Sequence, residues 1–85
     1  MNEEPYSLLL VDDDEATLES MTTYFTIRGF AVTAKSNGLE ALKLLETRTD
    51  FDAVITDIVM PDVSGIGVIS VVKRRLPGVP LIAIT

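Results

Sequence analysis

The sequence contains no cysteine and no histidine. Disulfides, zinc–thiolate sites and cysteine nucleophiles are therefore excluded, and no histidine is present to bind a metal or act as a base. Any chemistry must come from carboxylates, hydroxyls, lysines and the backbone. The chain also lacks an apolar run near the roughly 18 residues needed to span a membrane. Residues 1–7 are too polar and acidic for a signal peptide, so we expect a cytoplasmic protein.

Basic residues are also scarce, because 13 aspartates and glutamates outnumber 7 lysines and arginines and give a net charge of −6. Such a surface repels phosphates, so direct binding of nucleic acid by this segment is not expected. It suits a cation or a basic protein partner better. The 85 residues allow a single domain, residues 1–85. A mean hydropathy of +0.34 favours strands that are buried on both faces.

Short apolar runs alternate along the chain with stretches of helical spacing. The apolar runs predict four strands, at residues 7–11, 30–34, 53–56 and 81–84. This alternation predicts an α/β fold, namely a doubly wound parallel sheet of the form (βα)3β with helices on both faces.

Capping residues mark where the intervening helices begin and end. Asp13 or Asp14 can cap the first helix, and Gly29 can end it. Asn37 and Glu40 have the spacing of a capping box for the second helix. The third helix is predicted to end at the Pro-Gly pair 77–78, with its apolar face formed by Val68, Ile69, Val72 and Leu76.

Oxygen-bearing side chains follow three of the predicted strands. Asp12 and Asp13 come after the first strand, Asp57 after the third and Thr85 after the fourth. Ligands of open parallel sheets bind beyond the carboxyl ends of the strands, so these side chains meet if the three strands are neighbours. Converging carboxylates repel one another, and Mg²⁺ relieves that repulsion with oxygen ligands. Asp57 can then act as the nucleophile that accepts a phosphoryl group, with the Thr85 hydroxyl bonded to a phosphoryl oxygen.

Each of these features also has an ordinary structural interpretation. Three aspartates after a strand are common in turns and helix caps, and Asp57 before a proline-containing loop is typical of a turn. Thr85 alone is typical of a β-branched residue at the end of a strand. Their joint placement at one edge of the sheet favours the functional interpretation.

Four segments together resemble the receiver domain of bacterial two-component response regulators. They are LLLVDDD (8–14), SNGLEAL (36–42), FDAVITDIVMPDVSG (51–65) and PLIAIT (80–85). The resemblance implies a flavodoxin-like fold, a Mg²⁺ site at Asp12 and Asp13, and a phosphoacceptor at Asp57. It also implies metal ligation by the Val59 backbone carbonyl and a phosphoryl-binding role for the Thr85 hydroxyl. The implied donor is a sensor histidine kinase or a histidine phosphotransfer protein, which makes the chain a self-phosphorylating substrate in signal transduction rather than a turnover enzyme.

The resemblance covers four strands and three helices of a fold with five of each. The last helix-strand-helix unit is not matched, and that unit would supply a lysine that pairs with the phosphoryl group. Phosphoryl transfer is therefore expected to be impaired in this form. The fourth strand would also be an unprotected edge beside exposed apolar surface, and we expect the 85-residue form to self-associate.

Two other functions fit parts of the pattern. Asp12 and Asp14 have the spacing of a Mg²⁺-dependent phosphatase that passes through an aspartyl phosphate, with Asp12 as the nucleophile. The third possibility is a structural fragment or half-fold that self-associates without signalling, which the unmatched lysine favours.

Overall fold

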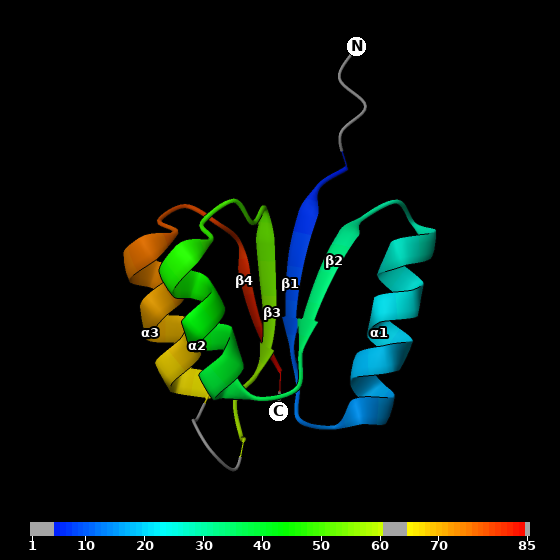
Figure 1. The fold of residues 1–85 in the computed structure, drawn as a ribbon, viewed down its shortest axis with the longest axis horizontal. Coiled ribbons are helices and arrows are strands. Elements are labelled where there is room, and N and C mark those ends of the chain that lie inside the picture. Colours follow the sequence, from blue (N-terminus) through cyan, green and yellow to red (C-terminus); the bar gives the residue numbers. More distant parts are fainter. Residues whose placement is uncertain (1–4, 61–64, 85) are drawn as a thin grey trace.

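A computed structural model describes residues 5–60 and 65–84 of the chain. Strands and helices alternate in the order β1 (Ser7–Val11), α1 (Glu15–Ile27), β2 (Ala31–Lys35), α2 (Gly38–Thr47), β3 (Ala53–Asp57), α3 (Gly65–Arg75) and β4 (Leu81–Ile84). The strands form one parallel sheet in the order β2-β1-β3-β4 (Figure 1). The predicted (βα)3β sheet is confirmed, and β3 lies between β1 and β4, so the residues that follow these three strands lie at the same end of the sheet.

The sheet carries α1 on one face and α2 with α3 on the other (Figure 1). Successive side chains of a strand point to opposite faces, and β1 is buried on both. Leu8 and Leu10 belong to a core with Leu18 of α1. Leu9 and Val11 belong to a larger core beneath α2 and α3. The two cores fix β1 at the centre of the molecule, and with it the position of the aspartates that follow.

Both predicted helix caps are present. Asp14 caps α1, since its carboxylate accepts a hydrogen bond from the Thr17 amide at 3.2 Å and another from the Thr17 hydroxyl. At α2 the capping box is reciprocal: the Glu40 amide donates to Asn37 Oδ1 at 2.8 Å, and Asn37 Nδ2 donates to Glu40 Oε2 at 2.7 Å. Each cap satisfies one backbone amide that has no partner within the helix.

The prediction for β2 was one residue too early at both ends. Phe30 is not in the strand, because its amide donates to the Phe25 carbonyl at 3.0 Å and its ring packs against that of Phe25. Lys35 is in the strand, because its carbonyl accepts from the Asp12 amide at 3.2 Å. A local bond at the end of α1 thus sets the start of β2, and a bond to the residue after β1 sets its end.

Two further boundaries differ slightly from prediction. Asp57 is the last residue of β3 rather than the first after it, since it pairs with Ile84. The α3 helix ends at Arg75, before the predicted end. The Leu76 amide still donates to the Val72 carbonyl of α3 at 2.7 Å, and the Leu76 side chain is buried in the core. Of the predicted apolar face of α3, Val68, Val72 and Leu76 are confirmed as core residues, whereas Ile69 is only half-buried and lies outside the core.

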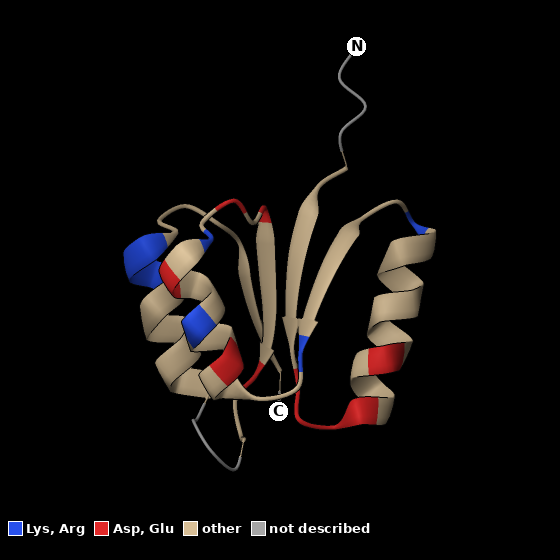
Figure 2. Ribbon diagram, viewed as in Figure 1, with Lys and Arg blue, Asp and Glu red and all other residues tan. Residues whose placement is uncertain are grey.

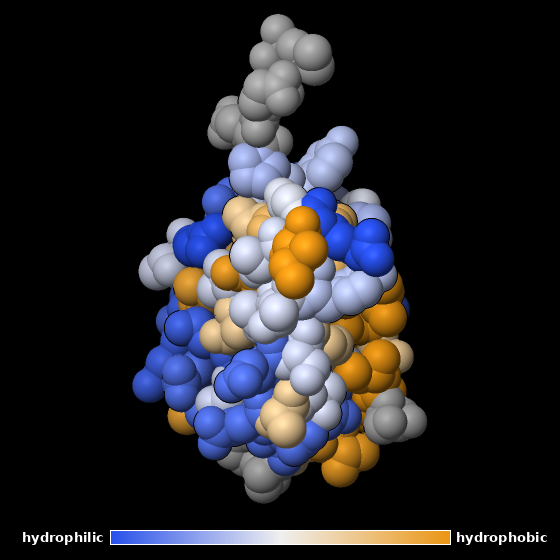
Figure 3. All heavy atoms as spheres, turned by 90° about the vertical axis from the view of Figure 1, so that its right-hand side faces the viewer, coloured by the Kyte–Doolittle hydropathy of each residue, from blue (hydrophilic) through white to orange (hydrophobic). Residues whose placement is uncertain are grey.

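The surface is uneven in charge and hydropathy. Acidic residues gather at the edge where β1 and β3 end (Figure 2). Hydrophobic side chains gather along the right-hand margin of the face shown in Figure 3, beside a largely hydrophilic area. Among the described residues, no helix is long and apolar enough to cross a membrane.

Candidate metal and phosphoacceptor site

Two neighbouring strands bring three aspartates together. Val11 of β1 pairs with Thr56 of β3, so the next residue of each strand, Asp12 and Asp57, lies at the same level of the sheet. Asp13 follows directly. Each of these three aspartates offers a carboxylate oxygen, and the three oxygens lie within 4.8 Å of one another. This donor set fits a hard divalent cation, which prefers several oxygen ligands.

Backbone amides orient two of the carboxylates. The Asp14 amide donates to Asp12 Oδ1 at 2.9 Å. The Val59 amide donates to Asp57 Oδ1 at 3.1 Å. One oxygen of each carboxylate is thereby held by the chain, which leaves Oδ2 as the oxygen available to a ligand or a reacting group.

The three carboxylates differ in their surroundings. Asp12 is 4% exposed, Asp57 is half-buried and Asp13 is exposed. Burial raises the pKa of Asp12 above its usual value, and the negative charges of Asp57, Asp13 and Asp14 raise the pKa further, against the opposing hydrogen bond from the Asp14 amide. A cation at this position would favour the charged form of Asp12.

Several predicted positions are not brought into this cluster by described contacts. Thr85 lies outside the described residues. Val59 is 72% exposed, and its amide, not its carbonyl, makes the described contact with Asp57. Metal ligation by the Val59 carbonyl therefore stays a prediction.

Sequence reasoning did not single out Thr56. This residue is fully buried, and its hydroxyl donates to the Asp57 carbonyl at 3.0 Å. In the sequence it was interpreted only as the last residue of an apolar strand. The available signal was a hydroxyl next to the candidate phosphoacceptor in an otherwise apolar run.

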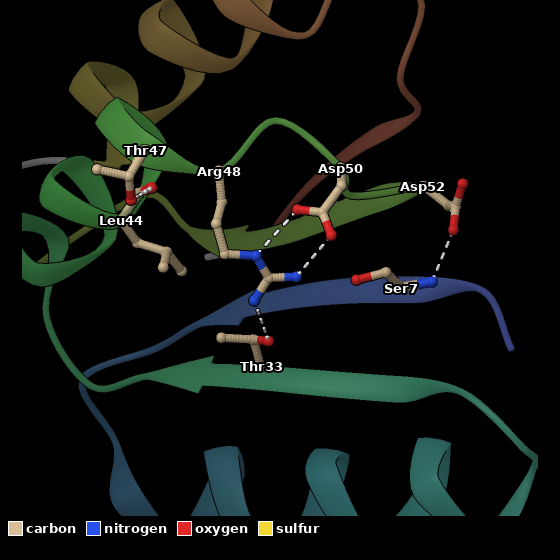
Figure 4. Close-up of polar contacts among 7 residues, drawn as sticks. All are labelled: Ser7, Thr33, Leu44, Thr47, Arg48, Asp50 and Asp52. Carbon is tan, nitrogen blue, oxygen red and sulfur yellow. Dashed lines mark hydrogen bonds and ion pairs between the residues drawn. The ribbon is translucent and has the colours of Figure 1, made fainter.

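A surface cleft of about 500 Å³ lies near Tyr6, at the end of the sheet where β1 and β2 begin. Arg48 in this cleft is engaged with its neighbours: its guanidinium binds both carboxylate oxygens of Asp50, at 2.9 and 3.1 Å, and the Thr33 hydroxyl at 3.2 Å (Figure 4). The cleft contains none of the three clustered aspartates. Cleft volume therefore does not locate the candidate site, and we assign it from the donor set instead.

Comparison with known proteins agrees with this geometry. The family model for the response regulator receiver domain matches residues 8–85. Response regulator SaeR of Staphylococcus aureus (strain USA300) is 37% identical over 78 residues, which cover 92% of this chain and 33% of SaeR. The chain thus spans about a third of the length of this curated relative.

Two crystal structures show the same fold. A response regulator receiver protein from Sinorhizobium medicae WSM419 matches with a TM-score of 0.88 and 31% identity, over 96% of this chain and 67% of that one. A response regulator protein from Burkholderia pseudomallei, determined with a phosphorylated aspartic acid, a calcium ion and citrate, matches with a TM-score of 0.83 and 26% identity, over 92% of this chain and 45% of that one. With three aspartates at the carboxyl edge of a parallel sheet and a family match over residues 8–85, the chain belongs to the response regulator receiver domain family of two-component systems.

Proposed function

We propose that this chain accepts a phosphoryl group on Asp57 with the help of Mg²⁺, and that the donor is a histidine kinase or a histidine phosphotransfer protein. The observation that carries the proposal is the convergence of carboxylate oxygens from Asp12, Asp13 and Asp57 within 4.8 Å. A bound divalent cation supplies positive charge that offsets the charge of the incoming phosphoryl group.

The reaction uses the free oxygen of Asp57. Asp57 Oδ2 forms a bond to phosphorus while the bond from phosphorus to the imidazole nitrogen of the donor breaks, and the electron pair of that bond stays on the imidazole. The product is an acyl phosphate. The Val59 amide holds Oδ1 at 3.1 Å, so the carboxylate is presented in one orientation. Asp12 and Asp13 supply the remaining carboxylate ligands of the cation.

Relatives support this assignment. The Burkholderia pseudomallei protein contains a phosphorylated aspartic acid and a calcium ion, the two features proposed here for Asp57 and its cation. Asp14 provides a second argument, against the phosphatase alternative. That alternative pairs Asp14 with a nucleophilic Asp12, whereas here the Asp14 carboxylate is bonded to Thr17 as a helix cap.

The test is phosphoryl uptake by the whole chain from a small phosphodonor such as acetyl phosphate, measured by intact mass with Mg²⁺ and with a chelator. We expect one phosphoryl group with Mg²⁺, none with the chelator and none in Asp57→Asn. Uptake that persists in Asp57→Asn but is lost in Asp12→Asn would favour the phosphatase. Mg²⁺ binding without any uptake would support the structural half-fold and overturn the phosphoacceptor proposal.

The expected rate of phosphoryl uptake depends on the lysine that pairs with the phosphoryl group in the family. The lysines of the chain lie on β2, α2 and α3, namely Lys35, Lys43 and Lys73. None of these three lysines matches the one that pairs with the phosphoryl group in the family, so we propose that uptake is slow. We further propose that the domain works in the cytoplasm and does not itself bind nucleic acid.

A further inference from the structure

Thr56 is one of two polar or charged residues that are buried among the described residues, and the other is Asp12. It lies in β3 immediately before Asp57, and its side chain is fully enclosed. A buried hydroxyl is costly unless it is hydrogen-bonded. The Thr56 hydroxyl meets that need by donating to the Asp57 carbonyl at 3.0 Å.

Gly65, the first residue of α3, packs against the backbone of Asp57 and Ile58. A β-carbon at position 65 would lie 2.0 Å from the Asp57 carbonyl oxygen, so only glycine allows this approach. The Gly65 amide also donates to the Ile58 carbonyl at 2.6 Å. The Asp57 carbonyl therefore has the Thr56 hydroxyl and the Gly65 α-carbon as close neighbours.

We propose that Thr56 is a positioning residue for the phosphoacceptor. Its hydroxyl fixes the carbonyl of Asp57, and with it the backbone from which the Asp57 carboxylate and the Val59 amide project. The contact between that amide and Asp57 Oδ1, at 3.1 Å, then leaves Oδ2 in a defined place. The role rests on the proposed function, since orientation of Asp57 matters only if Asp57 reacts.

A purely structural role for Thr56 makes the opposite prediction. The residues paired with Thr56 in the neighbouring strands, Val11 and Ala83, are apolar, and valine has nearly the same shape as threonine and is equally suited to a strand. If only packing mattered, Thr56→Val would behave like the parent chain, and Thr56→Ser would be the damaging change because it loses a buried methyl group.

The experiment compares Thr56→Val with Thr56→Ser in phosphoryl uptake from acetyl phosphate at saturating Mg²⁺. Loss of one hydrogen bond in the reacting geometry predicts a rate roughly 3- to 10-fold lower in Thr56→Val. Thr56→Ser retains the hydroxyl and is expected to stay within about twofold of the parent chain. An unchanged rate in Thr56→Val, or an equal loss in both variants, would overturn the positioning role.

A second measurement tests the positioning role of Thr56 independently of phosphoryl uptake by Asp57. Hydrogen exchange of the Val59 amide reports its bond to Asp57 without requiring phosphoryl uptake. We expect faster exchange in Thr56→Val and parental exchange in Thr56→Ser. If the parent chain takes up no phosphoryl group, the proposed function fails, yet this exchange still decides whether Thr56 positions Asp57. Equal exchange in all three chains would reject the role.

Discussion

At the scale of single residues, Asp12 carries the largest electrostatic conflict of the site. It is nearly enclosed, and Asp13, Asp14 and Asp57 all place negative charge around it. Burial is the largest of the causes that raise its pKa. One hydrogen bond from the Asp14 amide offsets part of this cost. Without a cation, the fold therefore holds a carboxylate whose pKa is raised because its charged form is disfavoured.

This conflict predicts how Asp12→Asn changes stability. Because the folded-state pKa of Asp12 is raised, the folded chain binds its proton more tightly than the unfolded chain, and stability declines as pH rises from the unfolded pKa through the folded one. Asparagine removes that decline and can still accept from the Asp14 amide. In chelator at pH 7 we expect a higher unfolding midpoint for Asp12→Asn, by about 4–8 °C if the change is of the usual size of about 1 kcal/mol.

Circular dichroism melts between pH 4 and 8 measure this effect, and Asp50→Asn is the control. Arg48 bonds Asp50 and lowers the pKa of that exposed carboxyl, so Asp50→Asn should be slightly less stable than the parent throughout this range, and the difference should vanish only below the folded-state pKa of Asp50. Saturating Mg²⁺ should raise the midpoint of the parent chain and not that of Asp12→Asn. A less stable Asp12→Asn in chelator would contradict the assignment of strain to Asp12.

At the scale of helices and strands, the features that were predictable from sequence are those that depend on neighbouring residues. Apolar runs located the four strands, and the Asn37–Glu40 pair located the start of α2 because its bonds are local. The start of β2 was missed because the Phe30 amide bonds back to α1. That bond belongs to the Schellman motif that ends α1, in which Gly29 has a φ of 96°. Gly29 therefore carried a local signal that β2 begins after Phe30.

The candidate site was also predictable only in part. Parallel topology alone brings the residues after β1 and β3 to one edge, and this placed Asp12, Asp13 and Asp57 correctly. The bond from Thr56 to the Asp57 carbonyl was not predictable, because a threonine at the end of a strand is equally typical of simple β-branched packing. Thr85 lies outside the described residues, and its role stays a prediction.

The start of α3 offers a test at this scale. Gly65 has an ordinary φ, unlike Gly29 and Gly78, so its requirement is space against the Asp57 carbonyl and not backbone freedom. In Gly65→Ala the helix start or the end of β3 must shift. We expect a loss of roughly 1–3 kcal/mol in the free energy of unfolding, measured by urea denaturation, together with slower phosphoryl uptake.

The matched control is Gly67→Ala, the same exchange two residues further along α3. Alanine is favoured over glycine inside a helix by about 1 kcal/mol, so this variant should be at least as stable as the parent chain. Equal destabilisation by both exchanges would mean that α3 is intolerant of alanine in general. The contact between Gly65 and Asp57 would then have no special part.

At the scale of the whole molecule, the two outer strands of the sheet, β2 and β4, differ in their surroundings. At the β2 edge, Lys35 ends the strand and the Arg48 side chain binds Thr33. Residues 81–84 of β4 include no charged side chain, and in the described part of the chain β4 bonds only to β3. Ile82 is 52% exposed there. With a net charge of −6, two copies repel each other least where no charge is present.

We therefore predict that the 85-residue chain self-associates through β4, with two copies related by twofold symmetry so that each edge bonds its equivalent. Burial of an isoleucine contributes about 1.5–3 kcal/mol, so Ile82→Lys should weaken association roughly 10- to 100-fold. Light scattering across a concentration series measures this. Ile27→Lys is the control, because Ile27 is 80% exposed at the end of α1, away from β4. A constant monomer mass for the parent chain would contradict the prediction, and loss of association in Ile27→Lys alone would place the contact on α1.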